Sequence, residues 1–162
     1  MPRILQCHSR GDVRFSPFGA RVRMFGRLDN IENHYQSAKV FENGRGPADW
    51  REAREMKRAK LRQIGWRIGP RLLKTRQDRG DPKVFALEDF GIQLYCLLWC
   101  KYIRCHPELV EHARGFDAFE DPFAGNFPFS QAKVWELVAE HEDGVERLAA
   151  MGSELADLLK RS

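Results

Sequence analysis

Residues 84–105 read VFALEDFGIQLYCLLWCKYIRC, and this stretch decides the predicted fold. Its apolar side chains recur every three or four residues, at positions 87, 90, 94, 97, 98 and 102. Such spacing places them along one face of an α-helix. We therefore expect residues 84–105 to form the main core helix of the chain.

Shorter helices are expected on both sides of this one, each marked by a capping residue, a proline or an apolar stripe. They are predicted from Ile31 to about Phe41, from Pro47 to about Ile64, from Pro107 to about His112, from Gln131 to His141 and from Val145 to Leu159. Residues 3–7 and 21–25 have short apolar or alternating patterns that are typical of strands. Several helices and few strands predict an α+β, predominantly α-helical fold.

The length of 162 residues suits one compact domain. We expect residues 1–141 to form it, and residues 142–162 to add an amphipathic helix that packs on this domain or extends it. The polar residues 75–82 are expected to form an exposed loop. No internal repeat or long linker divides the sequence.

Composition excludes several classes of protein. Apolar residues make up 43% and charged residues 31%, which is an ordinary globular balance. No apolar run approaches the roughly 18 residues that span a bilayer, and the N-terminus lacks the pattern of a secretory signal. We therefore expect a cytoplasmic protein without a membrane partner. Three of its four cysteines fall within or at the end of the core helix, which favours reduced thiols over a disulfide framework.

Charge is unevenly distributed along the chain. Residues 45–79 contain 12 Lys or Arg against four Asp or Glu, although the whole chain carries only +4. A basic region in a near-neutral protein indicates an anionic partner, such as a phosphate-bearing small molecule or a nucleic acid. A solvated, arginine-rich helix face explains the same run equally well.

The segment with the most chemical information is residues 31–41, IENHYQSAKVF. On a helix, positions i, i+3, i+4 and i+7 share a face, and those positions hold Glu32, Tyr35, Gln36 and Lys39. That face would present a carboxylate, a phenol, an amide and an amine to one pocket. An exposed polar helix face has the same spacing, so periodicity alone leaves both interpretations open.

This segment resembles the signature helix of the NADAR (YbiA-like) N-glycosidase family, which reads approximately E-H-Y-Y-Q-A-Q-K-F. Upstream, residues 15–18 (FSPF) resemble the family's F-S-N-F element. Downstream, residues 68–71 (IGPR) stand where the family has a Gly-Arg turn, and residues 101–109 and 116–119 are similar to later elements. The resemblance covers about residues 15–140.

The resemblance implies a hydrolase that cleaves an N-glycosidic bond of a ribosylated or ADP-ribosylated nucleobase, for example ADP-ribosyl-guanine, or of a related ribosyl-phosphate intermediate. The substrate would be a phosphate-bearing nucleotide or an ADP-ribosyl group, either free or on DNA or RNA, and no cofactor or metal would be needed. Carried onto this sequence, the catalytic candidates are Glu32, Lys39 and Asp117. The substrate-binding candidates are Phe15, Ser16, Tyr35, Gln36, Gly69, Arg71 and Phe119.

These residue types suit the chemistry. Cleavage of a C–N glycosidic bond passes through an oxocarbenium-like sugar, which a carboxylate such as Glu32 stabilises or supplies with an activated water. Lys39 fits two roles, a contact to phosphate or ribose and a Schiff-base nucleophile. Asp117 offers a second carboxylate for acid–base work.

Two rival hypotheses belong to other classes of protein. The first is a non-catalytic module that binds nucleotide or nucleic acid through the basic residues 45–79. The second is a small antitoxin or phage-type interaction protein that works through its surface.

Overall fold

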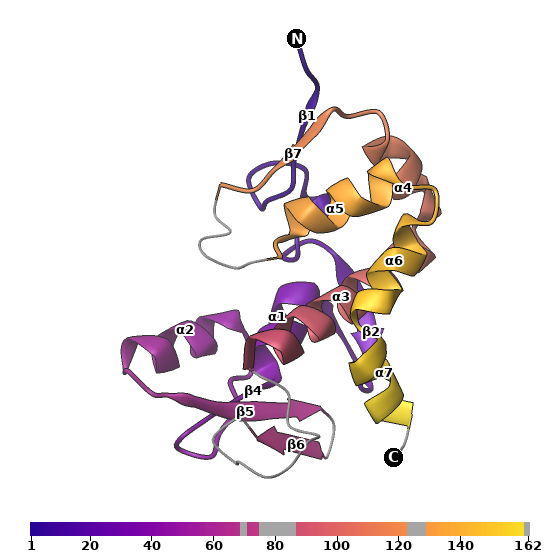
Figure 1. Cartoon of the computed structure of the whole chain (residues 1–162). Helices are drawn as coiled ribbons and strands as arrows, with labels where there is room; N and C mark the ends of the chain where they lie inside the picture. Colours follow the sequence, from indigo (N-terminus) through magenta and orange to yellow (C-terminus); the bar gives the residue numbers. More distant parts are fainter. Residues whose placement is uncertain (69–70, 75–86, 123–128, 161–162) are drawn as a thin grey trace.

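Helix α3, Leu87–Cys105, is the element around which the others pack. The computed structural model describes residues 1–68, 71–74, 87–122 and 129–160. The fold is α+β and mostly helical, as the sequence predicted (Figure 1). The predicted core helix is confirmed from Leu87 onward, while its expected first turn and the expected loop 75–82 lie outside the described residues.

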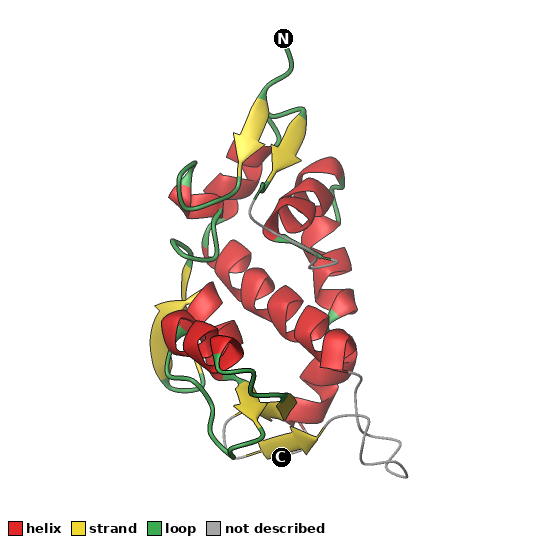
Figure 2. Ribbon diagram, turned by 90° about the vertical axis from the view of Figure 1, so that its left-hand side faces the viewer, coloured by secondary structure: helices red, strands yellow, loops and turns green. Residues whose placement is uncertain are grey.

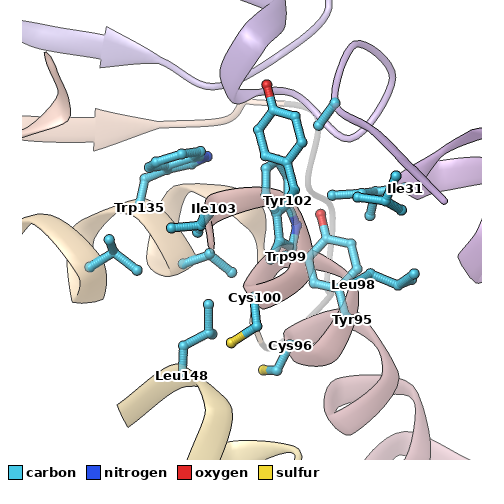
Figure 3. Close-up of a cluster of buried hydrophobic side chains, with 14 of the residues drawn as sticks. Ile31, Tyr95, Cys96, Leu98, Trp99, Cys100, Tyr102, Ile103, Trp135 and Leu148 are labelled. Carbon is cyan, nitrogen blue, oxygen red and sulfur yellow. The ribbon is translucent and has the colours of Figure 1, made fainter. Parts of the chain in front are cut away.

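The core follows the apolar stripe of α3. Phe90, Leu94, Leu98, Trp99 and Ile103 have at most 1% of their surface exposed. Residues from most other elements close over them, and Figure 3 shows part of this cluster. The burial of so many large side chains along one helix is the main source of stability of the fold.

Two helices at the C-terminus, α6 (Gly144–Met151) and α7 (Ser153–Lys160), pack against α3. The sequence predicted one continuous helix here, but Gly152 interrupts it. A Cβ atom on Gly152 would lie 2.8 Å from Cδ2 of Leu97 and 3.0 Å from the carbonyl oxygen of Gln93, so the close approach of the chain to α3 favours glycine. Leu148 and Leu155 are fully buried, so this segment belongs to the same core.

Helices α4 (Pro107–Ala113) and α5 (Gln131–Glu140) lie within a residue of their predicted bounds. The predicted helix from Pro47 to Ile64 is much shorter: α2 spans Trp50–Arg58. Asp49 caps its start by accepting a hydrogen bond from the amide of Glu52. Lys60, with a φ of 60°, turns the chain out of the helix.

Strands form three small sheets. In the first, β1 (Ile4–Gln6) pairs in parallel with β7 (Ala118–Glu120). In the second, β2 (Arg21–Met24) forms a hairpin with β3 (Arg27–Asn30). In the third, β5 (Gln63–Ile68) lies between β4 (Lys39–Phe41) and β6 (Arg71–Lys74), antiparallel to both.

Of these seven strands, the sequence predicted only β1 and β2. The strand β4 also corrects the first predicted helix, because α1 covers only Ile31–Ser37. Val40 and Phe41 are buried in β4, where β-branched and aromatic side chains pack well on a pleated surface. Figures 1 and 2 place the β1–β7 pair and the β4–β6 sheet at opposite ends of the molecule, with helices between them.

Candidate functional site

Helix α1 carries the first part of the candidate site and is fixed at its N-terminus. The side chain of Asn30 accepts a hydrogen bond from the amide of Asn33 at 2.7 Å, which caps the helix. The amide of Glu32 donates to the carbonyl of Pro17 at 3.0 Å. A backbone hydrogen bond therefore links the FSPF segment, residues 15–18, to the first turn of α1.

Glu32 is a partly buried carboxylate in the first turn of α1. Gln36 donates from Nε2 to Oε1 of Glu32 at 2.8 Å, one helical turn away. Burial raises the pKa of Glu32, Asp121 raises it further, and Gln36 and Lys39 act in the opposite direction. A carboxyl group with a raised pKa is suited to exchange protons near neutral pH.

Lys39 belongs to β4 and not to α1, so the predicted single helix face for all four residues is wrong. The side chain of Lys39 nevertheless lies close to Tyr35 on α1. Nζ lies 5.1 Å from the centre of the Tyr35 ring, a cation–π distance. Burial lowers the pKa of Lys39 to about 8, with a further decrease from Lys57, while Glu32 opposes the decrease.

Aromatic rings surround Tyr35 on its other sides. Its ring lies 5.4 Å from that of Trp66 and 5.6 Å from that of Tyr95, both in edge-on orientation. Gly91 on α3 makes room for this arrangement, because a Cβ atom there would lie 2.9 Å from Oη of Tyr35 and 3.3 Å from the Trp66 ring. The site thus has a rigid aromatic wall beside the Glu32 carboxylate and the Lys39 amine.

The carboxylate that interacts electrostatically with Glu32 is Asp121. Asp121 accepts a hydrogen bond from Gln131, and Gln131 accepts one from Oη of Tyr95 at 3.0 Å. The chain Asp121–Gln131–Tyr95 thus connects α5 to the aromatic wall around Tyr35. Sequence reasoning preferred Asp117 to Asp121 as the second carboxylate, and it did not place Tyr95 in the site.

Asp117, the predicted catalytic partner, lies elsewhere. It is exposed, it accepts a hydrogen bond from the amide of Arg3 at 2.8 Å, and it directly precedes β7. The β1–β7 pair is at the opposite end of the molecule from β4, which carries Lys39 (Figure 1). The structure therefore groups Asp121 with Glu32 and assigns Asp117 to the join between β1 and β7.

Three predicted substrate contacts have packing or turn roles. Phe15 is fully buried and packs edge-on against Trp135 at 4.5 Å between ring centres. Ser16 is also buried, and its Oγ accepts a hydrogen bond from the amide of Phe18. Phe119 is partly buried in β7 against the core.

The predicted Gly-Arg turn is only partly visible. Gly69 lies outside the described residues, and Arg71 is the first residue of β6, paired with Ile68. The structure therefore leaves the expected contacts of Gly69 and Arg71 with phosphate as predictions.

The basic side chains of residues 45–58, up to the end of α2, face solvent. Arg51, Arg54, Lys57 and Arg58 are exposed on α2, whereas Ala53 and Met56 face inward. Glu55 pairs with Arg58 at 2.9 Å. Helix α2 is therefore amphipathic, with the solvated, arginine-rich face that the charge pattern indicated.

No protein-family model matches the sequence, and no curated protein matches it significantly. The resemblance to the NADAR family therefore stands on the residues quoted above. Within the described ranges, no helix is both long enough and apolar enough to cross a bilayer. Over the same ranges, no three metal-ligating side chains of His, Cys, Asp or Glu come together.

Proposed function

We propose that the protein is a hydrolase that cleaves the N-glycosidic bond of a ribosylated or ADP-ribosylated nucleobase, such as ADP-ribosyl-guanine, or of a related ribosyl-phosphate intermediate. One observation carries the proposal: a partly buried carboxylate, Glu32, and an amine of lowered pKa, Lys39, flank the same tyrosine, Tyr35. Such perturbed groups gather at functional sites more often than on ordinary surfaces.

Glu32 is assigned the chemistry at the sugar. As the C–N bond breaks, the anomeric carbon becomes positively charged and the nucleobase leaves with the bonding electrons and gains a proton. An ionised Glu32 stabilises that charge and accepts a proton from the attacking water. Gln36, hydrogen-bonded to Oε1, fixes the orientation of the carboxylate.

Lys39 fits either of the two roles expected from the sequence. With a pKa of about 8, a sizeable fraction of its amine is neutral at pH 7.5 to 8, which provides a lone pair for attack on the anomeric carbon. The amine displaces the nucleobase, which leaves with the bonding electrons and gains a proton. The bond from the anomeric carbon to the ring oxygen then breaks, the ring oxygen takes up a proton lost by the nitrogen, and a Schiff base results. Water hydrolyses this Schiff base, which releases the sugar and regenerates the amine. In its charged form, the same amine binds ribose or phosphate oxygens.

Product analysis tests the activity directly. Wild-type protein is incubated with an ADP-ribosylated guanosine oligonucleotide and with a panel of ribosylated nucleotides, and mass spectrometry follows release of ADP-ribose or ribose phosphate. We expect release by the wild type, its loss in Glu32→Gln, and normal release by Glu111→Gln, which removes an exposed carboxylate on α4. Absence of release from every substrate by the wild type contradicts the proposal.

Borohydride trapping distinguishes the two roles of Lys39. Reduction during turnover fixes a Schiff base as a stable mass increase on the peptide that contains Lys39. Lys39→Arg keeps the positive charge but cannot form this adduct. An adduct on Lys39 supports the nucleophile, whereas turnover without an adduct, retained in Lys39→Arg, supports the contact role.

A second candidate function, a module that binds nucleotide or nucleic acid without catalysis, is favoured by the exposed basic face of α2. Its affinity would fall steeply with salt, because phosphate contacts release counterions. Replacing Arg51 and Arg54 by Gln would weaken it, while Glu32→Gln would leave it intact. A pure interaction protein would show neither product release nor a thermal shift with ADP-ribose.

A further inference from the structure

A pocket lies beside the β2–β3 hairpin, and we call it the hairpin pocket. Its volume is about 360 Å³, near the lower end of small-molecule sites. The hairpin contributes Phe25 and Arg27, the end of α1 contributes His34, and β4 and β5 contribute Lys39 and Arg67. Of the four residues in the Glu32 motif, Lys39 is the one that lines the hairpin pocket.

Arg27 on β3 is one of the cations that line this pocket. Its Nη2 binds Asp29 at 2.7 Å, which fixes the plane of the guanidinium group. Its Nε is shielded from solvent, and among the described residues no acceptor lies within hydrogen-bonding distance. Because Nε is shielded, a ligand in the pocket would meet the accessible part of the Arg27 side chain, which is 42% exposed.

The charge balance of the pocket favours an anion. Arg67 extends from β5 as an exposed cation on the same pocket. His34 is buried and hydrogen-bonded from its ring to the carbonyl of Val22, and burial lowers its pKa. None of the described residues that line the pocket is acidic. Two guanidinium groups at one cavity are the usual arrangement for phosphate or carboxylate oxygens.

Phe25 gives the pocket an apolar edge. It occupies the first position of the two-residue hairpin turn with a φ of 53°, and Gly26 follows with a φ of 77°. This turn prefers Asn or Gly at both positions, and a bulky residue there is strained. The side chain of Phe25 is 47% exposed, so its ring lies at the surface beside the pocket.

We propose that the hairpin pocket binds a phosphorylated small molecule of nucleotide type, with its phosphoryl group on Arg27 and Arg67 and its ring against Phe25. The pocket is larger than a phosphate alone, and it therefore accommodates a sugar or a base as well. This site is separate from the Glu32 carboxylate, and its occupancy does not require the protein to be an N-glycosidase.

Calorimetric titration with AMP and with adenosine tests the proposal. We expect the wild type to bind AMP at least tenfold more tightly than adenosine, because adenosine lacks the phosphoryl group. Arg67→Gln and Arg27→Gln each remove one guanidinium group from the lining of the pocket, so each should weaken AMP binding by about tenfold. Arg114→Gln, which alters an exposed arginine paired with Glu111 on α4, should have no effect.

Two results would overturn the proposal. One is equal affinity of the wild type for AMP and adenosine. The other is AMP binding that survives both Arg67→Gln and Arg27→Gln. If this binding is then lost in Tyr35→Ala, the nucleotide lies beside Glu32. Competition with ADP-ribose then identifies the source of the phosphoryl group. Displacement of AMP indicates the phosphates of the ADP-ribosyl ligand, and lack of displacement indicates a separate phosphorylated molecule; both results support the pocket.

Discussion

The amine of Lys39 on β4 lies 5.1 Å from the centre of the Tyr35 ring, although Tyr35 belongs to α1. Helix and strand therefore deliver the two side chains from different directions. The C-terminal turn of α1 ends at Ser37, and the chain passes directly into β4. The turn between α1 and β4 thus brings Lys39 close to Tyr35, which the sequence analysis had expected from a continuous helix.

The electrostatic relation between Lys39 and Glu32 predicts a measurable pKa change. Glu32 raises the pKa of Lys39, so removing its charge should lower that pKa below the present value of about 8. NMR titration of ¹³C-methylated lysines measures this, with Lys39→Arg identifying the signal. We expect one lysine to titrate near 8 in the wild type and at lower pH in Glu32→Gln. A Lys39 signal near 10.5 in both proteins would contradict a buried amine.

The placement of Asp121 predicts an effect that Asp117 should not have. Asp121 raises the pKa of Glu32, so Asp121→Asn should lower it. If ionised Glu32 is required for turnover, the acid limb of kcat/KM should then move to lower pH. Asp117→Asn serves as the matched control, because Asp117 is exposed beside β1. Equal shifts in the two variants would remove Asp121 from the site.

Gly91 predicts a coupled effect on Tyr35. Alanine favours a helix by about 1 kcal/mol over glycine, but its Cβ would lie 2.9 Å from Oη of Tyr35. We expect Gly91→Ala to lose that gain, to change stability by less than about 1 kcal/mol and to reduce turnover by displacing the phenol.

The double variant Gly91→Ala/Tyr35→Phe removes the clashing oxygen and isolates this contact. It should be more stable, by about 1 kcal/mol, than the two single changes predict by simple addition. Chemical denaturation of the four proteins measures the coupling. Additive free energies would show that Gly91 and Tyr35 are independent.

The hairpin turn predicts a gain in stability. Phe25→Asn places a residue that tolerates positive φ at a strained position, so the free energy of unfolding should increase by about 1 kcal/mol. Phe25→Ala keeps a Cβ without this tolerance and should gain much less. Thermal unfolding of the three proteins provides the comparison. If Phe25→Asn is less stable than the wild type, the Phe25 ring contributes packing that outweighs the backbone strain.

Local patterns predicted where the helices lie, but not the early ends of α1 and α2 or the break at Gly152. The apolar stripe of α3 and the proline at the start of α4 are local signals, and the helices predicted from them are present in the structure. The strands were mostly missed because β3, β5 and β6 are stabilised by pairing with other segments, which a local pattern does not contain.

The same limit applies to the candidate site. Glu32, Tyr35 and Gln36 share a helix, so their spacing was informative. Asp121 joins them only through tertiary packing, in which Gln131 on α5 hydrogen-bonds to Tyr95 on α3. The sequence around Asp121 has no periodicity that would distinguish it from Asp117.

The parallel pairing of β1 with β7 joins Ile4–Gln6 to residues that follow them by 114 positions. During synthesis on the ribosome, the first strand emerges long before its partner, since translation adds only about 5–20 residues per second. Pairing of β1 with β7 is therefore delayed by at least several seconds, until β7 has left the exit tunnel. Formation of this small sheet is thus tied to synthesis of the chain through β7, and a ribosome stalled before Ala118 would carry a nascent chain in which β1 has no native partner strand.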